Sequence, residues 1–120
     1  MLPDDVLQFV RAAIRSVWVL ELLLQLHRDP GRAWGVDELI RELRASTGIV
    51  AGGLAELVSA RLVEENGGLY RYKPLPALAG LVERLAAAYS TYPVAVTQAI
   101  LSAPSDRIQS FADAFRIKKE

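Results

Sequence analysis

Apolar residues recur three and four residues apart along most of this 120-residue chain, which is the spacing of one face of a helix. Proline, glycine and serine lie between the periodic stretches, where helices begin or end. The pattern predicts helices over residues 3–27, which Ser16 can divide in two, and over 36–45, 46–60, 77–89, 93–101 and 105–120. The chain is therefore expected to be mainly α.

One segment breaks the helical spacing and predicts a β-hairpin. Residues 62–65 and 69–73 read as two short strands, and Asn-Gly-Gly at 66–68 is a strong turn signal because Asn and Gly accept positive φ. Residues 28–35, "RDPGRAWG", are expected to form a turn, since Pro and Gly interrupt regular structure.

The second strand of this hairpin has two chemically different faces. Successive side chains of a strand point to opposite faces of the sheet. Tyr70 and Tyr72 therefore share one face, and Arg71 and Lys73 share the other. We expect the tyrosines to lean on the core and the cations to face outward.

The stretch Val17–Leu26 is apolar on almost every side. A helix of this kind must be covered all round, either by other helices of the chain or by a second subunit. Glu21 is the exception within it. Two interpretations of Glu21 are open: a buried acid paired with an arginine such as Arg15, or the single position that faces solvent.

The order helix, turn, helix, short turn, helix, hairpin resembles the winged helix-turn-helix domain superfamily over residues 17–74. "WGVDELIREL" is similar to the second helix of that family, "STGIVAGGLAELVSARLV" to its third, and "ENGGLYRYKP" to its wing. The resemblance implies a mainly α fold with one β-hairpin, in which residues 16–74 are the winged-helix core of a single domain, 1–120. Residues 1–15 then add an N-terminal helix, and residues 75–120 add C-terminal helices.

In DNA-binding members of this family the third helix enters the major groove and the wing touches the backbone. The resemblance therefore implies a transcriptional regulator whose partner is double-stranded DNA. Ser46 is a favourable N-cap for the third helix. The residues implied at the groove are Ser46, Thr47, Gly48 and Ala51, and those implied at phosphates are Arg44, Arg71 and Lys73.

The charge balance of the chain weakens the expectation of DNA binding. The chain has 14 basic and 14 acidic residues, and the segment from Arg32 to Lys73 is neutral as well. The helix from Ser46 to Ala60 contains no Lys or Arg, although direct readout of bases favours Arg, Lys, Asn and Gln. Phosphate neutralisation supplies most non-specific affinity, so binding should be weak unless the chain is a homodimer. Little net charge opposes such self-association.

An interaction module without DNA is the alternative function. The third helix carries a smooth outward strip that includes Gly52, Ala55 and Ser59, which would let another backbone approach closely. The same glycines can instead mark a bent or loosely formed helix. In the last predicted helix, Ile108, Phe111 and Phe115 form an apolar stripe that either meets a protein partner or closes the core of this chain.

The remaining chemistry argues against an enzyme, a metal site and a cofactor. His27 is the only histidine and there is no cysteine, so neither a zinc site nor a nucleophile with a histidine base is marked. "GIVAGG" lacks the Lys-Ser/Thr of a P-loop. The run Val17–Leu26 is shorter than the about 20 apolar residues of a membrane span. With no signal peptide visible, a cytoplasmic protein is expected.

Overall fold

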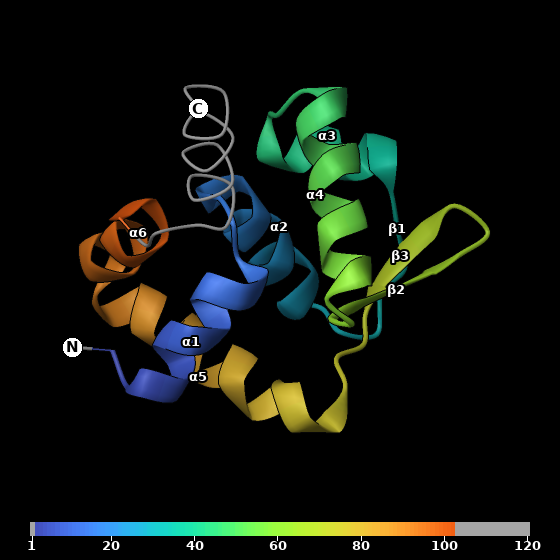
Figure 1. The fold of residues 1–120 in the computed structure, drawn as a ribbon. Coiled ribbons are helices and arrows are strands. Elements are labelled where there is room, and N and C mark those ends of the chain that lie inside the picture. The colour runs from blue at the N-terminus through green and yellow to red at the C-terminus, as the bar shows by residue number, and fades with distance from the viewer. Residues whose placement is uncertain (1, 103–120) are drawn as a thin grey trace, which may run out of the picture.

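A computed structural model of the chain describes residues 2–102 (Figure 1). The last predicted helix, with Ile108, Phe111 and Phe115, lies outside the described residues, and so do the expectations for it. The elements of the described part are α1 (Asp4–Ala13), α2 (Val17–His27), β1 (Trp34–Gly35), α3 (Val36–Leu43), α4 (Thr47–Ser59), β2 (Val63–Asn66), β3 (Leu69–Tyr72), α5 (Pro76–Thr91) and α6 (Pro93–Ser102). The expected mainly α fold is confirmed.

Ser16 divides the first predicted helix into α1 and α2. It adopts an extended conformation, and its hydroxyl oxygen accepts a hydrogen bond from the backbone N–H of Val19 at 3.2 Å. A serine N-cap satisfies a donor that the first turn of a helix leaves free. The later helix starts are also confirmed, since Ser46 caps α4, and Pro76 and Pro93 begin α5 and α6.

The sheet corrects the expectation of a hairpin alone. Trp34 and Gly35, expected in a turn, form β1, which pairs antiparallel with β3 and gives the strand order β1-β3-β2. The paired stretch is only two residues long, too short to show alternation in the sequence. It forms because the second edge of β3 offers free backbone groups and because burial of the Trp34 side chain holds the segment against the core.

The hairpin turn is also tighter than expected. Strand β2 begins at Val63 and runs through Asn66, which pairs with Leu69. Only Gly67 and Gly68 remain as the turn, with φ of 62° and 82°. Positive φ at both central residues matches the type I′ turn that suits the twist of paired strands.

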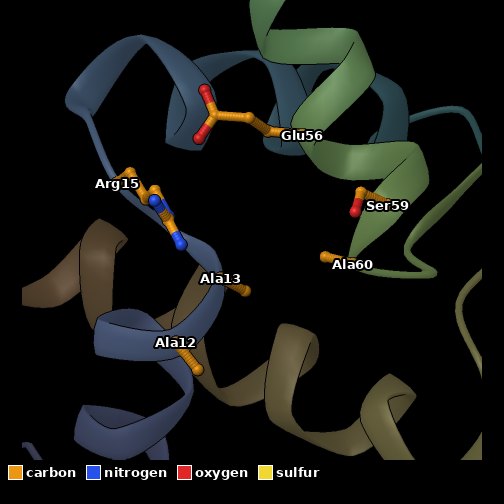
Figure 2. A pocket seen from close by; sticks show the side chains of 6 residues that line it. All are labelled: Ala12, Ala13, Arg15, Glu56, Ser59 and Ala60. Atoms are coloured by element: carbon orange, nitrogen blue, oxygen red, sulfur yellow. The ribbon is translucent and has the colours of Figure 1, made fainter. Parts of the chain in front are cut away.

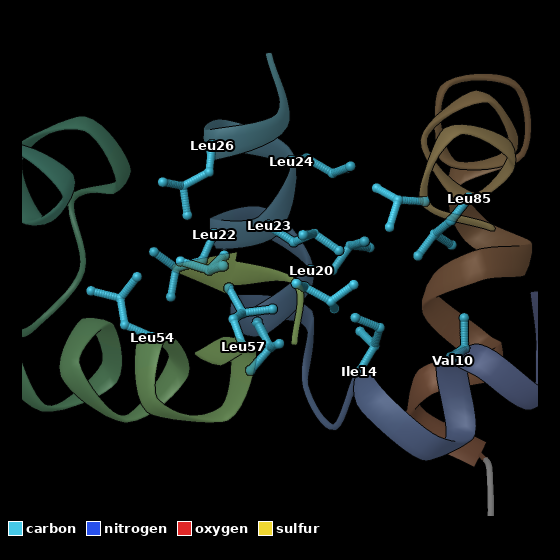
Figure 3. Packing of buried hydrophobic residues seen from close by; sticks show 14 of the residues in the cluster. Val10, Ile14, Leu20, Leu22, Leu23, Leu24, Leu26, Leu54, Leu57 and Leu85 are labelled. Carbon is cyan, nitrogen blue, oxygen red and sulfur yellow. The ribbon is translucent and has the colours of Figure 1, made fainter. Parts of the chain in front are cut away.

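Helix α2 lies at the centre of the molecule. Its neighbours are α3, α4, β3 and α6, and Figure 3 shows its leucines directed both toward α4 and toward α1 and α5. Leu20, Leu22, Leu23 and Leu26 are completely buried. Most of the cover that the sequence demands is thus supplied within one chain, although Trp18 in the first turn of α2 remains 40% exposed.

Glu21 is not paired with Arg15. Its carboxylate accepts a hydrogen bond of 2.7 Å from the hydroxyl of Tyr89 in α5. Both side chains are half-buried. The partner lies 68 residues away, so it could not be chosen from the spacing of charges near Glu21.

Candidate nucleic-acid interface

Helix α4 has one buried face and one bare face. Val50, Leu54 and Leu57 are fully buried beneath it. Gly53 lies so close to α2 that a Cβ there would overlap Cδ1 of Leu22. The outward positions are all exposed, and they are Thr47, Gly48, Ala51, Gly52, Ala55 and Ser59. A Cβ on Gly48 or Gly52 would meet nothing within 4 Å, so no described segment covers the strip at these two positions.

The N-terminal end of α4 brings four of the predicted DNA contacts together. The Ser46 hydroxyl oxygen accepts from the backbone N–H of Ile49 at 3.2 Å, so it serves the helix as its N-cap. Thr47 and Gly48 follow in the first turn, where free backbone N–H groups favour anions. Arg44 precedes them, exposed, at a φ of 53°, and its guanidinium has no ion-pair or hydrogen-bond partner among the described residues.

The wing carries its tyrosines inward and its cations outward, as expected. Tyr70 and Tyr72 are half-buried and pack against the core. The ring of Tyr72 meets His27, the last residue of α2, edge to face at a centroid distance of 5.2 Å. Arg71 and Lys73 are exposed. The hairpin therefore fixes the direction of both cations.

Both wing cations share one carboxylate. Arg71 lies opposite Glu64 in the strand register, and its guanidinium donates to Glu64 Oε1 at 2.8 Å. Lys73 Nζ lies 3.3 Å from Glu64 Oε2. These two hydrogen bonds, Arg71 first, lower the pKa of Glu64, so its carboxylate is ionised at neutral pH. One negative charge against two positive ones leaves the cluster cationic, but neither cation is free.

Arg61 belongs beside this cluster, although the sequence pattern did not assign it a role. It follows α4, is exposed and has a φ of 65°, and its guanidinium has no ion-pair or hydrogen-bond partner among the described residues. One open groove of about 650 Å³ lies between the end of α4 and the wing, and its charged lining consists of two cations, Arg61 and Lys73, and two carboxylates, Glu64 and Glu65. The available signal was its position between the predicted third helix and the first wing strand.

The three predicted phosphate contacts, together with Arg61, fall into two groups. Arg44 lies at the start of α4, while Arg61, Arg71 and Lys73 lie at its end and on the wing. Because α4 has 13 residues and rises 1.5 Å per residue, the two groups are separated by about 20 Å of helix.

The described residues, 2–102, contain neither a metal-binding cluster nor a helix that could span a membrane. In that range no three histidine, aspartate or glutamate side chains are grouped so that they could hold a metal ion. The helices there are all too short or too polar to cross a membrane. No protein-family model, no curated protein and no solved structure matches this chain.

Proposed function

We propose that this chain is a winged-helix DNA-binding protein that regulates transcription as a dimer. The helix α2, the short β1, the helices α3 and α4 and the hairpin follow one another in the order of that fold. The sheet order β1-β3-β2 agrees with it. The observation that carries the proposal is the outer face of α4, which is exposed along its whole length with arginine at both ends.

The reading chemistry of α4 is weak by itself. Its outer face offers one threonine hydroxyl, glycine backbone and alanine methyl groups, which suits apolar contact with thymine methyl groups. Affinity then rests on phosphate contacts from Arg44, Arg61 and the wing. Because Glu64 forms ion pairs with two of these cations, a single copy binds DNA weakly. A second copy on the same duplex adds its own phosphate contacts and so raises the affinity.

The experiment is fluorescence anisotropy of a random-sequence DNA duplex across a salt series, starting at low salt. Wild-type protein should bind at low salt and lose affinity as salt rises. Glu64→Gln should bind more tightly, with a salt dependence steeper by about 0.9 in log–log slope for each cation that gains a phosphate. Asp4→Asn is the matched control, because it changes net charge equally on α1, away from the wing.

Absence of binding at low salt by both wild type and Glu64→Gln would exclude the DNA-binding function. A sedimentation measurement on the same samples reports the dimer. We expect the molecular mass of a dimer at the protein concentrations at which DNA binds.

The alternative function is a protein-interaction module, and the exposure of Gly52 and Ala55 with open space above them favours it. Ala55→Lys separates the two functions. A cation on this face should strengthen DNA binding, whereas a long side chain should prevent another backbone from lying against the strip. The readouts are the same anisotropy series and recovery of a protein partner by the wild-type chain.

A further inference from the structure

A separate cavity lies between the end of α1 and the C-terminal half of α4 (Figure 2). Its volume is about 480 Å³, within the range of sites for small molecules. From α1 and the link to α2 come Ala12, Ala13 and Arg15, and from α4 and its C-cap come Glu56, Ser59 and Ala60.

Two opposite charges face this space without neutralising each other. Figure 2 shows the guanidinium of Arg15 and the carboxylate of Glu56 beside the same opening. They form no ion pair with each other, and neither has a hydrogen-bond or ion-pair partner elsewhere in the described residues. This differs from Glu38 and Glu64, whose carboxylates are each held by a neighbouring cation. The cavity therefore presents one free donor group and one free acceptor group.

The lining selects a class of ligand. A guanidinium binds a carboxylate through two parallel hydrogen bonds, and a carboxylate binds an ammonium group. A simple anion would also meet Glu56, and a simple cation would also meet Arg15, so each would be partly repelled. A molecule with both charges satisfies both groups. The methyl groups of Ala12, Ala13 and Ala60 supply an apolar wall for the rest of it.

We propose that this cavity binds a free α-amino acid with an apolar side chain, whose carboxylate contacts Arg15 and whose ammonium group contacts Glu56. The Ser59 hydroxyl lies in the same lining and accepts a further hydrogen bond from the ammonium group. The ligand bridges α4 and the segment that joins α1 to α2. This inference does not rest on DNA binding, because neither charged group belongs to the proposed DNA contacts.

The test is calorimetric titration of the full chain with L-phenylalanine and with L-leucine. Two derivatives probe the two contacts on the unaltered protein. N-acetyl-L-phenylalanine lacks the ammonium group, and L-phenylalanine amide lacks the carboxylate. We expect binding of at least one free amino acid, and a loss of tenfold or more for each derivative, equivalent to about 1.4 kcal/mol.

Two variants assign the contacts within the protein. Arg15→Gln and Glu56→Gln should each weaken binding of the free amino acid by about tenfold or more, whereas Arg11→Gln, an exposed arginine outside the cavity, should not. Moreover, the Arg15→Gln variant should bind L-phenylalanine amide as tightly as L-phenylalanine, because this variant has already lost the contact to the carboxylate. The proposal is overturned if neither amino acid binds at millimolar concentration, if the derivatives bind as well as the free amino acid, or if both variants bind unchanged.

Discussion

Helices α2 and α4 are both almost free of charge, yet the fold covers one on nearly every side and leaves half of the other bare. Helix α2 is built from leucine and valine, and its large side chains reach four other elements. Helix α4 buries three of its large side chains on one face and places glycine, alanine and serine on the other, while Ile49 and Val58 remain more than a third exposed. The difference lies in the size of the apolar residues and not in their number.

The physical reason is the area that each residue would leave in water. Burying a leucine contributes about 1.5–3 kcal/mol, whereas an alanine methyl group exposes little area at roughly 25 cal/mol per Å². Exposing α2 would therefore unfold the domain, while exposing the outer face of α4 is inexpensive. A bare, small-residue helix surface remains available for a partner.

The largest effect is expected where the two helices meet. Leu22→Ala removes a fully buried side chain that contacts Gly53 of α4, and should lower the free energy of unfolding by about 2–5 kcal/mol. Urea denaturation followed by circular dichroism measures this. A loss below about 1 kcal/mol would mean that the α2–α4 contact is loosely packed.

Two neighbouring glycines provide a sharper comparison within α4. Gly53→Ala forces a Cβ against the buried side chain of Leu22 and should destabilise by about 1–3 kcal/mol. Gly52→Ala enters open space, so it should stabilise by up to about 1 kcal/mol through helix propensity. Thermal unfolding of both variants checks the sign. Equal effects at the two positions would contradict the assignment of buried and bare faces.

The polar position of α2 should have a smaller effect. Tyr89→Phe removes the hydroxyl that donates to Glu21 and leaves a half-buried carboxylate without that donor, so it should destabilise by about 1 kcal/mol. The hydrogen bond to Glu21 also raises the pKa of Tyr89. Urea denaturation at neutral pH gives the difference. Unchanged stability would show that water replaces the tyrosine.

The smallest effect at neutral pH is expected at Tyr72, which covers the end of α2. Its hydroxyl is buried without a hydrogen-bond partner among the described residues, and burial, followed by the charge of Glu83, raises its pKa to about 12. The unfolded chain releases this proton near pH 10, before the folded chain does. The contribution of the Tyr72 hydroxyl to stability should therefore be constant below about pH 10 and should be lost as the pH rises from 10 to about 12.

Tyr72→Phe removes that alkaline loss and should change stability at pH 7 by less than about 1 kcal/mol. Unfolding curves at pH 7 and pH 11 compare the two proteins. If wild type and variant lose the same stability between these pH values, the hydroxyl of Tyr72 is not the group that titrates.

The sequence predicted the parts of this fold that depend on local pattern. Ser16 and Ser46 were recognisable as helix starts because a serine before an apolar stripe can cap the first turn. Gly67 and Gly68 marked the hairpin because their backbone tolerates positive φ. Alternation alone placed Tyr70 inward. These features depend on residues within a few positions of one another.

Contacts between distant segments could not be predicted in the same way. The pairing of Trp34 with Tyr70, the bond from Tyr89 to Glu21 and the approach of Gly53 to Leu22 each require the folded arrangement of separate elements. The functional surfaces also divide into features that the local pattern predicts and features that it does not. The outward strip of α4 followed from helical spacing, whereas the pairing of Lys73 with Glu64 and the cavity beside Arg15 did not.

The left-handed backbone at both ends of α4 has a consequence for engineering. Arg44 and Arg61 hold a conformation that glycine adopts readily and that other residues adopt at roughly 1 kcal/mol or more. Replacing either arginine with glycine should therefore relieve strain and raise the melting temperature. The same change deletes a guanidinium at an end of the exposed helix. Under the proposed DNA-binding function, a version of this protein stabilised against heat at these positions would be a poorer ligand for polyanions, so thermal stability and DNA affinity would change in opposite directions at the same two residues.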